Sequence, residues 1–63
     1  MVWEIIARME NGDGDEVVLW RARDSEGRIV YGVSRSQYGT ATEPVGPVYY
    51  SRRTALQNVP NPA

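Results

Sequence analysis

Residues 16–35 read EVVLWRARDSEGRIVYGVSR, and this stretch decides the fold. Its two halves, 16–23 and 28–35, are rich in β-branched and aromatic residues, which is typical of β-strands. Between them, residues 24–27 (DSEG) have the composition of a four-residue connector, a type I turn that ends on a left-handed glycine. Because so short a connector leaves no room for a crossover, the stretch predicts an antiparallel hairpin.

The connector also predicts a register in which Arg23 lies opposite Arg28. Gly32 then lies opposite Leu19, and the missing side chain leaves a gap in which another segment can approach closely. The other predicted pairs are Ala22–Ile29, Arg21–Val30, Trp20–Tyr31 and Val18–Val33. The face expected to form the core therefore comprises Val18, Trp20, Ala22, Ile29, Tyr31 and Val33, because a one-residue slip would bring arginines into it.

The residues before the hairpin predict a third strand of the same sheet. In residues 2–9 (VWEIIARM) the apolar types recur at every second position, which is the period of a strand. The members of this apolar face are Trp3, Ile5, Ala7 and Met9, and we expect Trp3 close to Trp20 in the core. Residues 10–14 (ENGDG) supply a turn into the hairpin.

The residues after the hairpin predict a loop, a short strand and a helix. Residues 36–47 form a loop that is long for so small a domain, and residues 48–50 can add a short fourth strand. Ser51 suits the N-cap of a helix over residues 52–58, which Pro60 and Pro62 end. The predicted fold class is α+β: a small antiparallel sheet of three to four strands with one short C-terminal helix. Residues 1–59 form a single domain and residues 60–63 an extended tail.

The residue types that are missing exclude most kinds of catalysis. The chain of 63 residues has no cysteine and no histidine, and all seven basic residues are arginine. Disulfides, thiolate zinc sites and cysteine nucleophiles are therefore excluded. No imidazole can act as a base and no lysine can form a Schiff base. We expect no catalytic residue, no cofactor and no enzymatic activity.

One short pattern offers oxygen ligands for a metal ion. Asn11, Asp13 and Asp15 alternate like the first ligands of a calcium loop. The sixth position of that loop is Glu16 where glycine is needed, and the twelfth is Ala22 where a bidentate acid is needed. We therefore predict a solvated turn and no metal site.

Charge and hydropathy limit the surfaces that the chain can bind. The formal net charge is −1 and the isoelectric point is about 5.2, whereas a general nucleic-acid binder is basic. The apolar runs are too short for a membrane span, and no basic leader precedes them. We expect no membrane partner and a location in the cytoplasm.

The face opposite the predicted core alternates arginine with apolar residues, which is the composition of protein interfaces. In the alternative interpretation, long arginine stems cover those apolar atoms and nothing binds there. Tyr38 in the loop is a further expected contact, since tyrosine often anchors interfaces. The residues predicted to bind a partner are Arg8, Leu19, Arg21, Arg23, Arg28, Val30 and Tyr38.

We therefore expect a non-enzymatic protein-interaction module that forms a homodimer or binds a larger protein. Its small size and its missing residue types fit a phage or mobile-element inhibitor of a host complex. The alternative hypothesis is a nucleic-acid-binding domain that contacts phosphates through the sheet, with Arg21, Arg23, Arg28 and Arg35 as its contacts.

Residues 20–61 also resemble the YegP-like family of small bacterial domains of unknown function. The resemblance lies in Trp20-Arg21-Ala22-Arg23, in Gly27, in Ile29-Val30, in Tyr50-Ser51-Arg52, and in Val59 with Asn61. It implies a β-β-β-α unit that pairs with a second copy, in tandem or as a dimer. It implies no activity.

Overall fold

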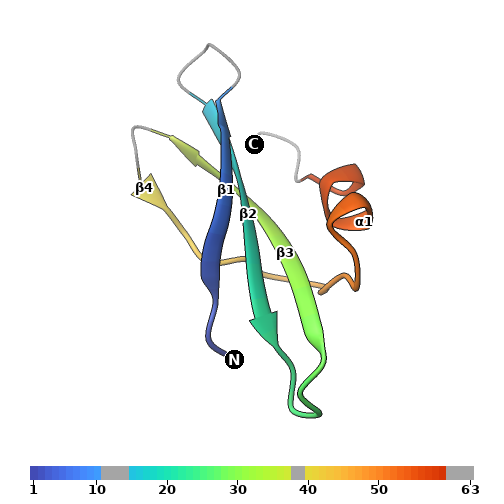
Figure 1. The fold of residues 1–63 in the computed structure, drawn as a ribbon. Coiled ribbons are helices and arrows are strands. Elements are labelled where there is room, and N and C mark those ends of the chain that lie inside the picture. Colours follow the sequence, from blue (N-terminus) through green and yellow to red (C-terminus); the bar gives the residue numbers. More distant parts are fainter. Residues whose placement is uncertain (11–14, 38–39, 60–63) are drawn as a thin grey trace.

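The computed structural model describes residues 1–10, 15–37 and 40–59 of the chain. The strands form one antiparallel sheet in the order β1-β2-β3-β4, and a single helix follows them (Figure 1). The elements are β1 (Glu4–Glu10), β2 (Asp15–Arg23), β3 (Ile29–Gln37), β4 (Thr40–Ala41) and α1 (Arg52–Gln57). The predicted sheet of three antiparallel strands with one short helix is confirmed. The predicted calcium-like pattern and the C-terminal tail lie largely or wholly outside the described residues.

The turn between β2 and β3 keeps the predicted glycine but is one residue shorter than expected. The Asp24 N–H donates to the Arg28 carbonyl at 2.9 Å, and the Gly27 N–H donates to the Asp24 carbonyl at 3.0 Å. Gly27 has a φ of +80°, a conformation in which any other residue would bring its Cβ too close to the backbone. The loop is therefore residues 25–27, a three-residue hairpin connection that ends on a left-handed glycine.

The shorter loop shifts the register of the hairpin by one residue, so the predicted register is wrong. Arg23 pairs with Ile29 and not with Arg28. The other pairs at this end are Ala22–Val30, Arg21–Tyr31, Trp20–Gly32, Leu19–Val33 and Val18–Ser34. Because a shift of one residue moves every side chain of a strand to the opposite face relative to its partner, the predicted core face divides between the two sides of the sheet.

One side of the sheet is covered by α1, and we call it the helix face. Leu19 and Val33, which are cross-strand partners, are buried there against Ala55 of the helix. The half-buried residues packed against them are Ile6, Ala7, Tyr31 and Tyr49. The helix begins where predicted, because the Ser51 hydroxyl accepts the Thr54 N–H at 3.1 Å as an N-cap.

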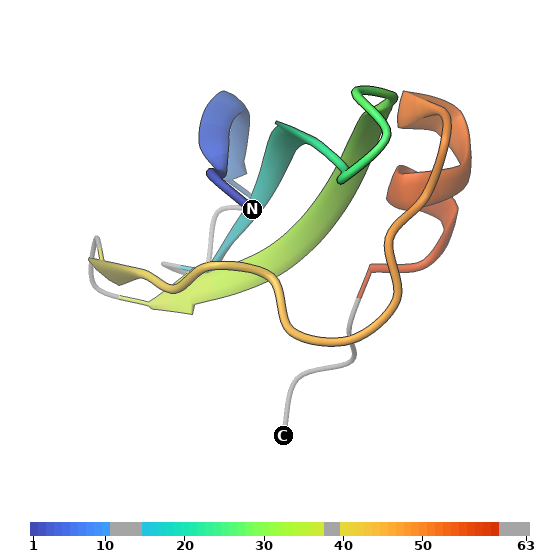
Figure 2. The ribbon, with the colours of Figure 1, turned by 90° about the horizontal axis from the view of Figure 1, so that it is seen from below.

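The opposite side, which we call the loop face, is covered by the segment between β4 and α1. This segment leaves the outer edge of β3 after Ala41 and returns to the same edge at Tyr49, where it enters α1 (Figure 2). On the way Pro44 packs onto Gly32, and Trp3 packs beside it. The residues buried on this face are Val18, Trp20, Ala22, Val30, Ser34 and Ser36. Both faces of the β2–β3 hairpin are therefore buried.

This burial corrects the expected outer face. Leu19 is 3% exposed and Val30 is 0% exposed, so neither can contact a partner from the folded chain. Ile29, which was expected in the core, is 41% exposed. The alternating pattern that suggested an interface instead reflects a sheet with two covered faces, whose strands carry apolar residues on both sides.

A β-bulge interrupts the alternation of β1. Ile5 pairs with Trp20, whereas Ala7, two residues later, pairs with Leu19, so that Ile6 is the extra residue. Opposite residues of an antiparallel pair share a face. Ile5 therefore belongs to the loop face and Ala7 to the helix face, and the single apolar face predicted for this strand is wrong.

The predicted fourth strand at residues 48–50 is reduced to one bridge. Tyr31 and Tyr49 exchange two backbone hydrogen bonds, at 2.7 and 2.8 Å, and the ladder does not continue beyond them. The short strand β4 lies instead at Thr40–Ala41 and pairs with the far end of β3. Segments of the chain thus line the outer edge of β3 at two places.

Candidate functional site

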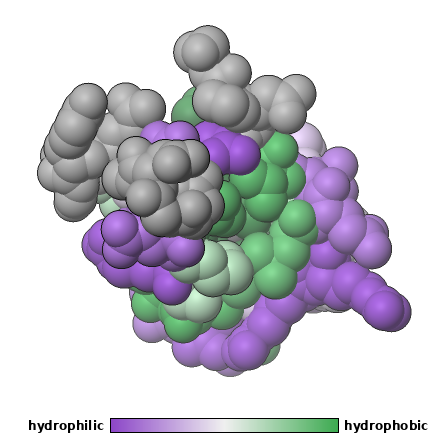
Figure 3. Space-filling model, turned by 90° about the horizontal axis from the view of Figure 1, so that it is seen from above, coloured by the Kyte–Doolittle hydropathy of each residue, from purple (hydrophilic) through white to green (hydrophobic). Residues whose placement is uncertain are grey.

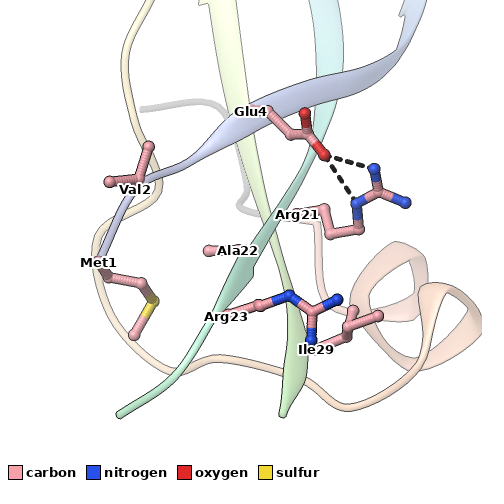
Figure 4. A pocket seen from close by; sticks show the side chains of 7 residues that line it. All are labelled: Met1, Val2, Glu4, Arg21, Ala22, Arg23 and Ile29. Carbon is pink, nitrogen blue, oxygen red and sulfur yellow. Dashed lines mark hydrogen bonds and ion pairs between the residues drawn. The ribbon is translucent and has the colours of Figure 1, made fainter. Parts of the chain in front are cut away.

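An open depression of about 610 Å³ lies beside the last residues of β2 (Figure 4). Its volume is within the range of roughly 300–1,000 Å³ that is typical of ligand pockets. It forms because the β1–β2 ladder begins only at the pair Glu4–Arg21, and the chain before Glu4 leaves the edge of β2. The residues that line it are Met1, Val2, Glu4, Arg21, Ala22, Arg23 and Ile29.

The lining combines exposed apolar side chains with charged ones. Met1 is 65% exposed and Val2 is 87% exposed, and both belong to the chain segment that lines the side of the depression opposite Arg23 and Ile29 (Figure 4). Apolar residues that are exposed together around a hollow are more informative than apolar residues scattered singly over a surface. Met1, Val2 and Ile29 are exposed together around this one hollow.

The two arginines of the depression differ in how their charges are neutralised. Arg21 forms an ion pair with Glu4, in which its Nε donates to Glu4 Oε1 at 2.8 Å. Arg23 is exposed, and its Nη1 donates to the Gly27 carbonyl at 2.9 Å. Within the described ranges no carboxylate forms an ion pair with Arg23. Its positive charge therefore remains available at the rim.

Arg28 lies in the turn below the depression and is held by carboxylates. Its Nε donates to Asp24 Oδ2 at 2.9 Å, and its Nη2 lies 3.1 Å from Glu26 Oε2. Its guanidinium also lies over the Tyr50 ring, 5.4 Å from the ring centre. Arg28 thus stabilises the turn, and two acids neutralise it.

Asp24 organises the same turn through its other oxygen. Asp24 Oδ1 accepts the backbone N–H groups of Glu26 and Arg28, each at 2.9 Å. The hydrogen bond from the Arg28 N–H is the largest cause that lowers the pKa of Asp24 below its ordinary value, and the Arg28 guanidinium acts in the same direction. The carboxylate is therefore charged whenever the turn is formed near neutral pH.

A second arginine–aromatic contact lies on the helix face, next to Arg21. The Arg52 guanidinium lies over the Tyr31 ring at 5.9 Å, and Tyr31 is the cross-strand partner of Arg21. Arg52 has no ion pair with any carboxylate that the structure describes. Arg21, Tyr31 and Arg52 therefore follow one another across the helix face.

The seven residues predicted to bind a partner do not form one surface. Arg21 and Arg23 line the depression, and Arg28 lies in the adjoining turn. Arg8 lies far from them, where its Nη1 contacts Glu16 Oε1 at 2.7 Å and Glu16 also accepts the Ser36 hydroxyl at 3.1 Å. Leu19 and Val30 are buried, and Tyr38 lies outside the described residues.

The sequence analysis missed five of the residues that line the depression, namely Met1, Val2, Glu4, Ala22 and Ile29. Ile29 was assigned to the core because of the register error. A correct reading of the three-residue turn would have placed it beside Arg23 on an exposed end of the sheet. The divergence of the chain before Glu4 has no signal in the sequence.

The described part of the chain shows no group of three or more acidic residues, histidines or cysteines that could hold a metal ion. None of its helices has the length and apolar character needed to cross a membrane. No protein-family model, curated protein or solved structure matches the chain. The resemblance to the YegP-like family therefore stays a prediction.

At the other end of the molecule, hydrophobic residues form a band between hydrophilic ones (Figure 3). Elsewhere in the described chain Met9 and Leu56 are each 38% exposed, whereas Met1 and Val2 of the depression are 65% and 87% exposed. The depression is therefore the stronger candidate for a binding site.

Proposed function

We propose that this protein is a non-enzymatic protein-interaction module whose binding site is the depression beside the end of β2. The observation that carries the proposal is that one depression is lined both by Arg23, which has no described ion pair, and by exposed apolar side chains. These apolar residues are Met1, Val2 and Ile29. Arginine beside exposed apolar groups is typical of protein interfaces. Inhibition of a host complex is one form that such binding would take.

A larger protein suits this site better than a second copy of the chain. The predicted homodimer relied on Leu19 and Val30 on an outer face, and both side chains are buried within their own sheet. What remains exposed is concentrated around a hollow, and a hollow accepts a protruding group from a partner of different shape. The proposed partner is therefore a different protein. A second copy of this chain is the alternative occupant of the same depression.

The nucleic-acid alternative has weaker support from the contacts. Two of its four arginines, Arg21 and Arg28, already form ion pairs with carboxylates that would repel phosphate. A phosphate would have to compete with those groups on a chain whose net charge is −1. Arg23 alone of the four combines exposure with an absence of any described ion pair.

Site-specific photo-crosslinking tests the proposal. A photoreactive phenylalanine at position 29 should give a discrete protein adduct in the native host cells. The same residue at position 45 is the matched control, since Val45 is 95% exposed and does not line the depression. With purified protein, an adduct of two chains from position 29 would identify the homodimer form.

Three outcomes would contradict the proposal. The first is an adduct with nucleic acid alone, and the second is equal protein adducts from positions 29 and 45. The third is no protein adduct from position 29 in the host cells.

A further inference from the structure

We infer that the depression binds an extended acidic segment of the partner, with a carboxylate on Arg23 and an apolar side chain against the exposed apolar lining. This inference rests on the proposed function and specifies its partner. Three features of the same site carry it: the excess of positive charge, the free backbone at the edge of β2, and the apolar residues of the lining.

The charge in the lining of the depression is unbalanced toward arginine. Arg21 and Arg23 line it with Glu4 as the one described carboxylate, and Glu4 is already engaged by Arg21. In the adjoining turn, Asp24 and Glu26 outnumber Arg28, so the side-chain charges of the lining and the turn together sum to zero. Arg52 adds a further positive charge across Tyr31. An incoming carboxylate is therefore attracted to this end of the sheet, and a basic segment is repelled.

The guanidinium of Arg23 is suited to a carboxylate. It has five N–H donors, of which the structure shows one in use, from Nη1 to the Gly27 carbonyl at 2.9 Å. That single bond fixes the side chain over the turn and leaves donors for a two-pronged contact with a carboxylate. A neutral amide cannot replace the charge of such an acceptor.

The backbone of Arg23 offers a place for an extended chain. Hydrogen bonds in an antiparallel ladder alternate from one side of a strand to the other. The Asp24 N–H bonds toward Arg28 on the β3 side, so the N–H and C=O of its neighbour Arg23 point to the β1 side. The β1–β2 ladder stops at Glu4–Arg21, which leaves that edge open at Arg23. An extended segment can therefore pair with the edge, as in β-strand addition.

The apolar lining defines what accompanies the carboxylate. Ile29 lies directly across from Arg23 in the ladder and is 41% exposed. An extended segment places alternate side chains on the same face. In a segment with a carboxylate on Arg23, the side chains two positions away lie on the same face. We therefore expect an apolar residue two positions from the acidic one, where it meets the exposed apolar lining.

Three synthetic peptides of one length, each with a polar and an apolar residue two positions apart, test the inference: acetyl-EELLEEL-amide, acetyl-QQLLQQL-amide and acetyl-KKLLKKL-amide. They are titrated into ¹⁵N-labelled full-length protein at low and at physiological salt. We expect the acidic peptide to bind at least tenfold more tightly than the neutral one, and the basic one not at all. We expect the largest shifts at the amides of Ala22, Arg23 and Ile29, and weaker binding at higher salt.

The variant Arg23→Gln should weaken binding of the acidic peptide about tenfold, which corresponds to about 1.4 kcal/mol. Arg53→Gln is the matched control: it removes the same charge from an exposed arginine outside the depression, and binding should stay within twofold. Arg23→Lys keeps the positive charge but loses the planar guanidinium that can bind both oxygens of a carboxylate. The affinity of this variant for the acidic peptide should therefore be intermediate. Thermal melts of all three variants establish that each is folded.

The inference is overturned if the neutral peptide binds as tightly as the acidic one. Equal losses in Arg23→Gln and Arg53→Gln, or shifts confined to other residues, would overturn it as well. A protein adduct from position 29 together with either result would leave the proposed function standing with a partner of different chemistry. Tight acidic-peptide binding with no such adduct would support the charge selectivity and contradict the proposed function.

Discussion

Pro44 packs directly onto the backbone of Gly32. A Cβ built at position 32 would lie 2.7 Å from Pro44 Cγ, 2.8 Å from Pro44 Cβ and 3.0 Å from Trp3 Cη2. Gly32 is also the cross-strand partner of Trp20. The missing side chain therefore allows the segment between β4 and α1 to close over the loop face.

We expect Gly32→Ala to destabilise the protein by about 1–3 kcal/mol, since the added methyl group forces Pro44 or Trp3 outward. Urea denaturation followed by tryptophan fluorescence measures the change. Pro44→Ala on the same background should recover part of the loss, because it removes the Cγ that the methyl group meets. A Gly32→Ala protein as stable as the parent would show that the segment does not pack as closely as the structure has it.

Trp20→Ala should cost about 3–5 kcal/mol, most or all of the stability of a domain of this size. Trp20 is buried on the loop face, and its Nε1 donates to Ser34 Oγ at 2.8 Å. Trp20→Phe keeps most of the apolar volume but leaves the buried Ser34 hydroxyl without that donor, so it should cost less than the alanine variant. Equal losses would mean that the hydrogen bond outweighs packing at this site. Circular dichroism melts distinguish these outcomes.

Leu19→Glu should prevent folding, because it would place an unpaired carboxylate between Val33 and Ala55. A homodimer held by an exposed Leu19 would instead give a folded monomer from this variant. Leu56→Glu is the matched control: Leu56 is 38% exposed, and the change should cost less than about 1 kcal/mol. A cooperative melt of Leu19→Glu near that of the parent protein would contradict the assignment of Leu19 to the helix-face core.

Asp24 makes the stability of the turn depend on pH. Its pKa is lowered in the folded state, so the unfolded chain takes up a proton first as the pH falls. The stabilisation is therefore complete above the unfolded pKa of about 3.9 and is lost as the pH falls through the lower folded value. Asp24→Asn should be less stable than the parent at pH 7, and the difference should narrow below pH ~4. A constant difference from pH 7 to pH 2 would exclude this carboxylate as the source.

Local chemistry was readable from the sequence wherever a short stretch determines it. The strands of the hairpin, the glycine at position 27 and the cap at Ser51 were all predicted, because β-propensity, a left-handed φ and an N-cap each depend on neighbouring residues. The register failed for a related reason. The turn type was right, but the loop was counted from Arg23 when Asp24 closes it.

Features that depend on distant parts of the chain could not be predicted in full. The bulge at Ile6 arises where β1 meets β2. The close approach at Gly32 was predicted from the missing side chain, but not that Pro44, twelve positions away, makes it. The depression beside Arg23 exists because the first residue of β1, Glu4, pairs with Arg21. The last two residues of β2 therefore have no partner on β1. The arginines of the site were found by residue type alone, and their apolar neighbours needed the three-dimensional structure.

The bulge in β1 has a consequence for how these molecules behave at high concentration. β1 is the outer strand of the sheet, and a regular outer strand is a template on which further chains can stack into fibrils. The bulge twists that strand and interrupts its regular hydrogen-bonding pattern, so a second chain cannot pair with it along a continuous ladder. The bulge thus protects the β1 edge from pairing with further chains, whereas the short edge of β2 at Arg23, beyond the last β1–β2 pair, has no such interruption.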